Sequence, residues 1–215
     1  MFQSFISHLE IALKQSLPGK PAQALLKPYL KINKNIDAPL PLVTPKKGAV
    51  MALIYSKYDV PHILFIERPV YDGVHSGQIA FPGGKIEKED ATVVDAALRE
   101  TFEEVGILQK DIKVLGALSE VYVFASNFMV FPFVGVIDNL STLKLQETEV
   151  AGILEIPLST FFEDNIIKEK PIKNAFGFTL MAPYYDLSGK TLWGATAMMV
   201  SELCTIIKDN NIRIN

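Results

Sequence analysis

The sequence predicts a mixed α/β fold for this chain of 215 residues. Apolar runs of strand length recur along the chain, and apolar residues at helical spacing appear near its start, middle and end. Hydrophobic residues make up 49% of the chain and the formal net charge is -3, which suits a domain with a sizeable core. We expect that domain over residues 46–208, preceded by a helix and connector over 1–45 and followed by a tail over 209–215.

The N-terminal segment predicts a short amphipathic helix that the Pro18-Gly19 pair closes. Its apolar positions are Phe2, Phe5, Ile6, Leu9, Ile11, Ala12 and Leu13. Because Glu10 and Lys14 interrupt the run and no basic region precedes it, we expect neither a signal peptide nor a membrane span. The helix is expected to pack on the rest of the chain or in a homodimer. The stretch from Lys27 to Lys47 indicates an extended connector.

Strand patterns follow the connector. The apolar runs Ala49–Tyr55 and His62–Glu67 flank a polar turn at Ser56–Asp59, which predicts a β-hairpin. Further strands are expected over 114–123, 128–138, 151–156 and 176–180. A last helix is expected from about Gly194 to Lys208.

The middle helix is the most informative element, within the run GGKIEKEDATVVDAALRETFEEVGI over 83–107. Thr92 with Asp95 predicts a capping box, Asp90 is an alternative cap for an earlier start, and Gly106 suits the C-terminal end. The expected buried positions are Val94, Ala97, Leu98, Thr101, Phe102 and Val105.

Glu100, Glu103 and Glu104 share one face of this helix, because residues three and four apart are neighbours on a helix surface. Clustered carboxylates with no Cys or His among them suit Mg²⁺ or Mn²⁺. A solvated acidic face paired with lysines is the plainer interpretation of an isolated E-x-x-E-E helix. The surrounding motifs favour the metal site.

These motifs resemble the Nudix hydrolase box, G-x5-E-x7-R-E-U-x-E-E-x-G-U, where U is aliphatic. The matching residues are Gly84, Asp90, Arg99, Glu100, Glu103, Glu104, Gly106 and Ile107. Asp90 stands in place of the first glutamate, eight residues rather than seven separate it from Arg99, and Thr101 occupies an aliphatic position. The longer loop is similar to that of the coenzyme A pyrophosphatase subgroup.

Further motifs resemble that subgroup. Arg68 and the run HSGQIAFPGG over 75–84 are similar to its R-S-x3-R-x-H-x-G-Q-x-A-F-P-G-G stretch, although Pro69 and Gly73 depart from it. Gly73 stands where the subgroup has a second arginine. Downstream, similarity continues at 126–132, at Glu149-Val150 and at 192–197, so the resemblance covers roughly Ala49 to Leu203.

The resemblance implies an α/β/α sandwich with a mixed sheet and a metal-dependent pyrophosphohydrolase. It favours coenzyme A or an acyl-CoA as substrate, cleaved to 3′,5′-ADP and 4′-phosphopantetheine or its acyl form. Alternative substrates are ADP-ribose, a dinucleotide or a nucleoside triphosphate. A Nudix regulator that binds a nucleotide without hydrolysing it is a further alternative.

The resemblance also implies catalytic roles. Glu100 and Glu104, with Glu103 directly or through water, are expected to hold Mg²⁺ or Mn²⁺, and the missing side chain of Gly84 lets the backbone approach the metal. Arg99 is expected to orient a neighbouring glutamate. Glu149 is the candidate general base, with Glu147 as its competitor.

Three residues are candidate substrate contacts. Arg68 is expected to bind phosphate oxygens, which suit the guanidinium fork, with a surface ion pair as the alternative. Gly83 allows close approach of the phosphates. His75 either binds a phosphate or braces the turn at Gly77.

Charge and cysteine content restrict the partners. The weakly acidic chain lacks a basic patch interleaved with aromatic residues, which argues against nucleic-acid binding, and we expect no membrane partner. Cys204 is the only cysteine, so an intramolecular disulfide is excluded and the chain suits a reducing cytoplasm. We expect Cys204 to be a packing residue.

Overall fold

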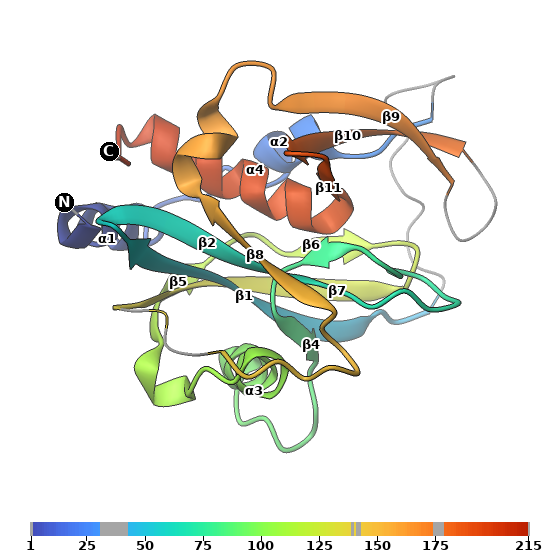
Figure 1. Ribbon diagram of the computed structural model, residues 1–215, viewed down its shortest axis with the longest axis horizontal. Coiled ribbons are helices and arrows are strands. Elements are labelled where there is room, and N and C mark those ends of the chain that lie inside the picture. Colours follow the sequence, from blue (N-terminus) through green and yellow to red (C-terminus); the bar gives the residue numbers. More distant parts are fainter. Residues whose placement is uncertain (1, 31–42, 139, 141–142, 174–178, 215) are drawn as a thin grey trace.

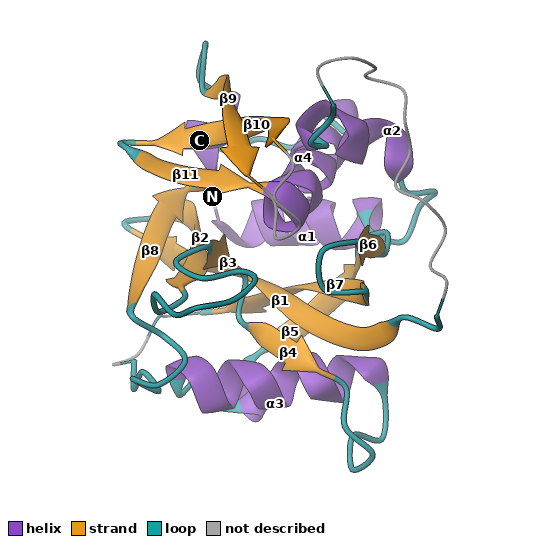
Figure 2. Ribbon diagram, turned by 90° about the vertical axis from the view of Figure 1, so that its right-hand side faces the viewer, coloured by secondary structure: helices purple, strands orange, loops and turns teal. Residues whose placement is uncertain are grey.

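The computed structural model describes residues 2–30, 43–138, 140, 143–173 and 179–214. A mixed sheet forms the middle layer, with helix α3 on one face and helices α1 and α4 on the other (Figures 1 and 2). A smaller three-stranded sheet lies beyond α4. This arrangement confirms the predicted α/β/α sandwich with a mixed sheet.

The main sheet has the order β3-β2-β1-β7-β5, with β4 paired to β1, β6 to β7 and β8 to β2. Its strands are β1 (Lys46–Lys57), β2 (Val60–Glu67), β3 (Ile79–Ala80), β4 (Gly83–Lys85), β5 (Lys113–Ala117), β6 (Val121–Val123), β7 (Phe128–Ile137) and β8 (Gly152–Pro157). β1 and β7 run parallel, from the Lys46–Phe128 pair to the Tyr55–Ile137 pair, whereas the other pairs are antiparallel.

Alternate residues of β1 and β2 enter two separate cores, as a sheet buried on both faces requires. Ile54 and Phe65 belong to the core shared with α1 and α4. Leu53 and Leu64 belong to the core beneath α3. The position of α3 on β1 and β4 is therefore set by apolar packing on one face of the sheet.

The predicted hairpin is confirmed, with a shorter turn than expected. Ser56 and Lys57 still pair with Pro61 and Val60, so only Tyr58 and Asp59 form the turn. Their φ values of 55° and 61° are those of a two-residue hairpin turn that matches the strand twist. β1 also begins earlier than expected, because its ladder with β7 already starts at Lys46.

The helices are α1 (Phe2–Ala12), α2 (Lys20–Gln23), α3 (Val93–Val105) and α4 (Gly194–Asp209), with short 3₁₀ turns η1 (Ala24–Leu26), η2 (Gln109–Asp111) and η3 (Leu158–Phe162). The predicted N-terminal and C-terminal helices are thus present. Phe5 and Leu9 of α1 are buried in the core that contains α4, whereas Ile11 is 59% exposed, contrary to its assignment as an apolar-face residue.

Two expectations about strands need correction. The strand expected over 114–123 is two strands, β5 and β6, because a register shift between Val114 and Gly116 and a break at 118–120 interrupt the pairing with β7. The segment over 176–180 lies partly outside the described residues, and β10 (Thr179–Leu187) begins within it.

The antiparallel sheet β9 (Ile167–Lys173), β10 and β11 (Lys190–Trp193) was otherwise not predicted. β9 has the sequence IKEKPIK and is mostly exposed, so it has no apolar alternation to indicate a strand.

Of the predicted connector, residues 31–42 lie outside the described part. In the tail, Ile212 is 7% exposed and packs in the α4 core. Among the described helices, none is long and apolar enough to cross a membrane.

Candidate functional site

Helix α3 begins with the predicted capping box. The Thr92 hydroxyl accepts from the Asp95 backbone N–H at 3.3 Å, and the Asp95 carboxylate accepts from the Thr92 backbone N–H at 2.9 Å. Asp90 is not the cap, since its carboxylate accepts from the Glu87 N–H and from Arg99. Phe102 was wrongly assigned to the buried side: it is 44% exposed, and Ala96 lies in the core instead.

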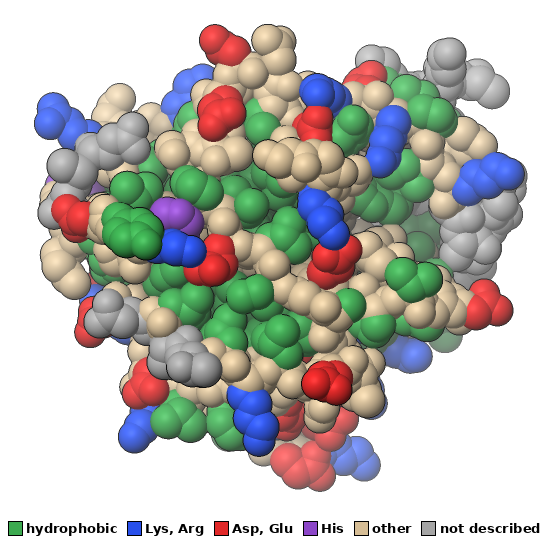
Figure 3. Space-filling model, in the orientation of Figure 1, with side chains coloured by type: hydrophobic (Ala, Val, Ile, Leu, Met, Phe, Trp, Pro, Cys, Tyr) green, Lys and Arg blue, Asp and Glu red, His purple; other side chains and the backbone are tan. Residues whose placement is uncertain are grey.

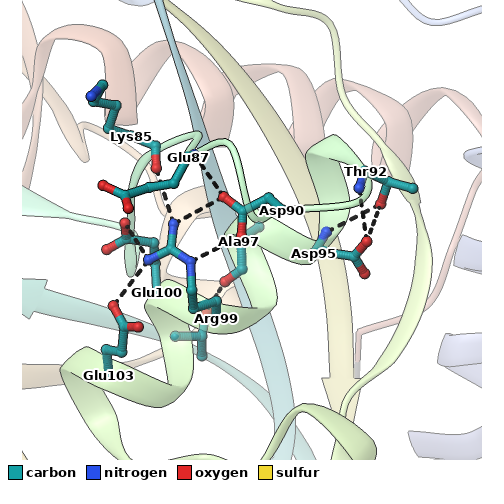
Figure 4. A network of polar contacts seen from close by, with 10 residues as sticks. Lys85, Glu87, Asp90, Thr92, Asp95, Ala97, Arg99, Glu100 and Glu103 are labelled. Atoms are coloured by element: carbon teal, nitrogen blue, oxygen red, sulfur yellow. Dashed lines mark hydrogen bonds and ion pairs between the residues drawn. The ribbon is translucent and has the colours of Figure 1, made fainter.

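Arg99 holds the acidic residues of this region together (Figure 4). Its Nε and Nη2 donate to the two oxygens of Asp90 at 2.9 and 3.1 Å, and Nη1 donates to Glu100 and Glu103, both at 3.0 Å. Nη2 also donates to the Lys85 carbonyl at 3.1 Å. These five contacts match the five N–H groups of a guanidinium, so Arg99 orients carboxylates and has no donor left for a substrate.

Glu104 is a buried carboxylate at the centre of the site. It is 2% exposed, and its Oε2 accepts from the Gly83 backbone N–H at 2.8 Å. Burial raises the pKa of Glu104 to about 8, despite the opposing effects of the Gly83 hydrogen bond and of the Arg68 charge. A cation beside this carboxylate would favour its charged form.

Glu100 lies against Gly84 of strand β4. A Cβ atom on Gly84 would stand 2.5 Å from the carboxyl carbon of Glu100, so only glycine leaves room for this side chain. Burial raises the pKa of Glu100, against the lowering effect of Arg99. Glu103, one turn from Arg99, is more exposed, at 52% of its side chain.

Gly83 is glycine for a different reason. Its φ is 149°, and a Cβ would collide with the Ala49 carbonyl and stand 2.5 Å from the Val50 Cα. The close packing of β4 on β1 therefore requires Gly83. Because its N–H already donates to Glu104, the geometry gives less support to Gly83 as a phosphate contact.

The segment that carries Glu149 is attached to the C-terminal end of α3. The Lys144 N–H donates to the Val105 carbonyl and the Gln146 N–H to the Glu104 carbonyl, both at 3.0 Å. These bonds satisfy helix-end carbonyls that otherwise lack partners. Gly106 makes the approach possible, since its φ is 78° and a Cβ would stand 2.9 Å from the Lys144 Cβ.

Glu149 is close enough for its negative charge to raise the pKa of both Glu100 and Glu104. The charge of Glu149, from a second segment, therefore adds to the negative potential at Glu100 and Glu104. This proximity favours Glu149 over Glu147 as the residue that could act on a water molecule there.

Arg68 directly follows strand β2 and lies near Glu104, whose pKa its charge lowers. Its Nε is buried and has no hydrogen-bond partner among the described residues. A buried donor without a partner is costly, so this guanidinium suits an oxyanion.

His75 has both ring nitrogens within hydrogen-bond distance of protein groups. Nδ1 lies 3.1 Å from the Gln78 side-chain oxygen, and Nε2 lies 3.1 Å from the Ser126 hydroxyl. This is the geometry of a brace. Gln78 and Ser126 lie in the motif stretches 75–84 and 126–132, but those motifs alone give neither residue a role.

The carboxylates of Glu100, Glu103 and Glu104 fit a hard divalent cation by their chemistry. Their donors are carboxylate oxygens, and acidic side chains gather on the α3 side of the molecule (Figure 3). Within the described residues, no three His, Cys, Asp or Glu side chains are already arranged to hold a metal. Glu100 and Glu103 lie against Arg99 and Glu104 against Gly83, so binding requires these carboxylates to turn.

The fold and these residues define a class of protein: a mixed α/β sandwich with a carboxylate-rich site between a helix and a glycine strand. The NUDIX domain family model matches residues 45–173, more than half of the chain. The chain belongs to the Nudix family. Nudix hydrolases use divalent metal ions, in agreement with the carboxylate donors.

Curated relatives support this membership. A protein of Pectobacterium atrosepticum named "Uncharacterized Nudix hydrolase NudL" is 31% identical over 172 residues, which are 79% of this chain and 86% of the relative. A Yersinia enterocolitica protein of the same name is 42% identical over 98 residues, 46% of this chain, and the match spans only 50% of that relative.

A solved structure shares the fold. The Nudix hydrolase RenU of M. smegmatis superimposes with a TM-score of 0.54 at 13% identity, over 77% of this chain and 87% of that one.

Proposed function

We propose that this protein is a Mg²⁺- or Mn²⁺-dependent hydrolase that cleaves the pyrophosphate bond of coenzyme A or an acyl-CoA. The products would be 3′,5′-ADP and 4′-phosphopantetheine or its acyl form. Three observations support the proposal: Glu100 packs against Gly84, the charge of Glu149 acts on both Glu100 and Glu104, and the buried Arg68 Nε near Glu104 has no hydrogen-bond partner among the described residues. The coenzyme A assignment depends on the motif that starts at Arg68 and ends at Gly84.

The chemistry requires charge neutralisation and an activated water. A divalent cation held by Glu100, Glu103 and Glu104 would supply the first, because a pyrophosphate otherwise repels its nucleophile. Glu149 would accept a proton from the water that attacks phosphorus. The P–O bond to the leaving phosphate then breaks, and no covalent intermediate with the protein is needed.

The remaining residues position the reactants. Arg68 would donate to phosphate oxygens, and Arg99 would hold Glu100 and Glu103 in place through the contacts described above. His75 serves as a brace in this proposal. Gly84 leaves space for the carboxylate of Glu100, while Gly83 positions the backbone beside Glu104.

A different substrate, such as ADP-ribose, a dinucleotide or a nucleoside triphosphate, has one observation in its favour. Gly73 stands where the coenzyme A subgroup has an arginine, and a Cβ there would lie 2.9 Å from a ring carbon of Tyr71. An aromatic ring therefore occupies the space that a larger side chain would need, and no cation at position 73 is available for a 3′-phosphate.

The cellular setting belongs to the same proposal. A single cysteine that packs beside the α4 core suits the reducing cytoplasm, and burial raises the pKa of Cys204 to about 12, which keeps the thiol protonated. We propose a small nucleotide derivative, and no nucleic acid or membrane, as the partner. A homodimer remains part of the proposal.

Competition by 3′,5′-ADP tests the substrate. With coenzyme A as substrate and Mg²⁺ present, 3′,5′-ADP should inhibit more strongly than 5′-ADP, because only the former contains the 3′-phosphate of coenzyme A. Equal inhibition by the two nucleotides, with faster turnover of ADP-ribose, would move the assignment to the second candidate.

A further inference from the structure

The loop over residues 69–77, here called the rim loop, leaves the sheet directly after Arg68. Its base continues the β2–β3 pairing, since the Arg68 N–H donates to the Gln78 carbonyl at 3.0 Å and the Gly77 N–H to the Pro69 carbonyl at 3.1 Å. Its tip is exposed, with Val70 at 90% and Tyr71 at 41%. Apolar burial therefore contributes little to the position of the rim loop, and polar contacts must fix it.

His75 carries the contact that reaches from the rim loop to another part of the chain. Its φ of 68° is uncommon for a residue with a side chain and has to be stabilised by its surroundings. Nδ1 meets Gln78 at the base of the loop, and Nε2 meets the Ser126 hydroxyl, 51 residues away in sequence, at 3.1 Å. The imidazole thus joins the rim loop to the turn between β6 and β7.

That turn is itself firmly attached. The Tyr122 hydroxyl donates to the Asn127 side-chain oxygen at 3.0 Å, and the Lys46 N–H donates to the Asn127 carbonyl at 2.9 Å. Ser126 is therefore presented from a support that is bonded to strand β1. A displacement of the rim loop relative to the sheet would break the contact between His75 and Ser126.

Arg68 stands at the base of the rim loop, next to this connection. Its buried Nε has no hydrogen-bond partner among the described residues, so its guanidinium is not fixed by such a bond at that atom. Its backbone is bonded to Gln78, which also contacts His75. A connected path therefore runs from Ser126 through His75 and Gln78 to Arg68.

We propose that Ser126 is a positioning residue for substrate binding: through His75 and Gln78, its hydroxyl holds the rim loop so that Arg68 faces the phosphates beside Glu104. This inference rests on the proposed function, in which Arg68 contacts the substrate. Ser126 itself touches neither substrate nor metal in this role.

Three variants test the hydroxyl. Ser126→Ala should raise KM roughly three- to tenfold, the loss of about one hydrogen bond, with a smaller effect on kcat. Ser126→Thr retains a hydroxyl and should recover most of the wild-type KM. Ser7→Ala is the matched control, because it also removes a hydroxyl hydrogen bond, to the Gln3 carbonyl on α1. An unchanged KM in Ser126→Ala, with the same thermal midpoint as the wild type, would overturn the proposal.

A double-mutant cycle separates positioning from general stability. If Ser126 acts through Arg68, Ser126→Ala should have little further effect in an Arg68→Ala background. If the KM increases of the two single variants multiply fully in the double variant, the proposal is overturned.

The same four proteins can be compared without turnover, by measuring their affinity for 5′-ADP calorimetrically in the presence of Mg²⁺. A wild-type protein that binds 5′-ADP but cleaves nothing would contradict the proposed function and leave the Ser126 inference to be decided by the binding cycle. If Ser126→Ala binds 5′-ADP with wild-type affinity, the positioning role of Ser126 is rejected.

Discussion

At the scale of single residues, burial and charge decide what the acidic side chains can do. Glu104 is buried against Gly83, and the negative charges of Glu100 and Glu149 lie nearby. Without a metal, the ionised form of Glu104 is therefore disfavoured. Arg99 offsets this for Glu100 and Glu103 by direct contact. A bound cation would relieve the charge repulsion among these carboxylates that Arg99 does not offset.

The raised pKa of Glu104 predicts how metal-free stability depends on pH. Its folded-state value of about 8 exceeds the ordinary 4.5, so the native state binds more protons between these values. The free energy of unfolding should therefore fall as pH rises from about 5 to about 8.

Urea unfolding in the presence of a chelator measures this dependence. Glu104→Gln should flatten it, whereas the exposed Glu89→Gln should leave it unchanged. A Glu104→Gln protein with the wild-type pH dependence would show that this carboxyl is not the source.

The five contacts of Arg99 predict that lysine cannot replace it. A lysine has three donors on one nitrogen and cannot bind both oxygens of Asp90 and still reach Glu100 and Glu103. Arg99→Lys should lower Mg²⁺ affinity or kcat/KM roughly 10- to 100-fold, as is usual when residues that orient metal ligands are changed. Arg213→Lys, at an exposed position, is the control. Equal activities of the two variants would contradict the orienting role.

At the scale of elements, the decisive contact joins the end of α3 to the segment that carries Glu149. Gly106 combines a left-handed backbone with an approach of Lys144 that any side chain would obstruct. The residue that ends the helix therefore also contacts the segment that leads to Glu149.

Gly106→Ala tests this contact, with Gly189→Ala as its matched control. Gly189 has a φ of 90° but no atom within 4 Å of a Cβ, so it carries the backbone strain without the collision. Both variants should lose about 1 to 3 kcal/mol of unfolding free energy, measured in urea. Only Gly106→Ala should also lower kcat/KM, by more than the fraction of unfolded protein explains. A matching loss in Gly189→Ala would show that strain alone accounts for the effect.

Sequence patterns predicted the elements that bury an apolar face or begin with a specific cap. The α3 capping box, the β1–β2 hairpin and α4 follow directly from Thr92 with Asp95, from the polar turn and from apolar spacing. The patterns failed for β9, whose exposed charged residues have no alternation, and for Phe102, which the spacing placed on the wrong side of α3.

The candidate site, too, could be predicted only in part from the sequence. The glutamates and Arg99 stand in a recognisable motif, so their grouping could be predicted. The contacts of Lys144 with Gly106 and of Ser126 with His75 join segments far apart in sequence, and tertiary folding alone brings them together.

At the scale of the whole molecule, the N-terminal segment is built into the core of the sandwich. Leu9 and Leu26 are fully buried with residues of α4, and Glu202 of α4 accepts from the Gly19 N–H and the Gln23 side chain. Residues before the main sheet therefore stabilise the face opposite α3.

Leu9→Ala should accordingly lower the free energy of unfolding by about 2 to 5 kcal/mol, the usual range for a cavity left by leucine. Ile11→Ala, two residues away and 59% exposed, should change it by less than about 0.5 kcal/mol. Urea unfolding followed by tryptophan fluorescence at Trp193 checks both. A loss for Leu9→Ala no larger than for Ile11→Ala would indicate that α1 is a dispensable appendage.

We propose that Glu100, Glu103, Glu104 and Glu149 make this protein a metal-dependent pyrophosphohydrolase. Mass-spectrometric product analysis tests it most directly, with coenzyme A, ADP-ribose and a nucleoside triphosphate incubated with Mg²⁺ or Mn²⁺, beside Glu104→Gln. We predict 3′,5′-ADP and 4′-phosphopantetheine from coenzyme A, only with metal, and strongly reduced in the variant. No cleavage of any substrate with either metal, or full cleavage by Glu104→Gln, would contradict the claim.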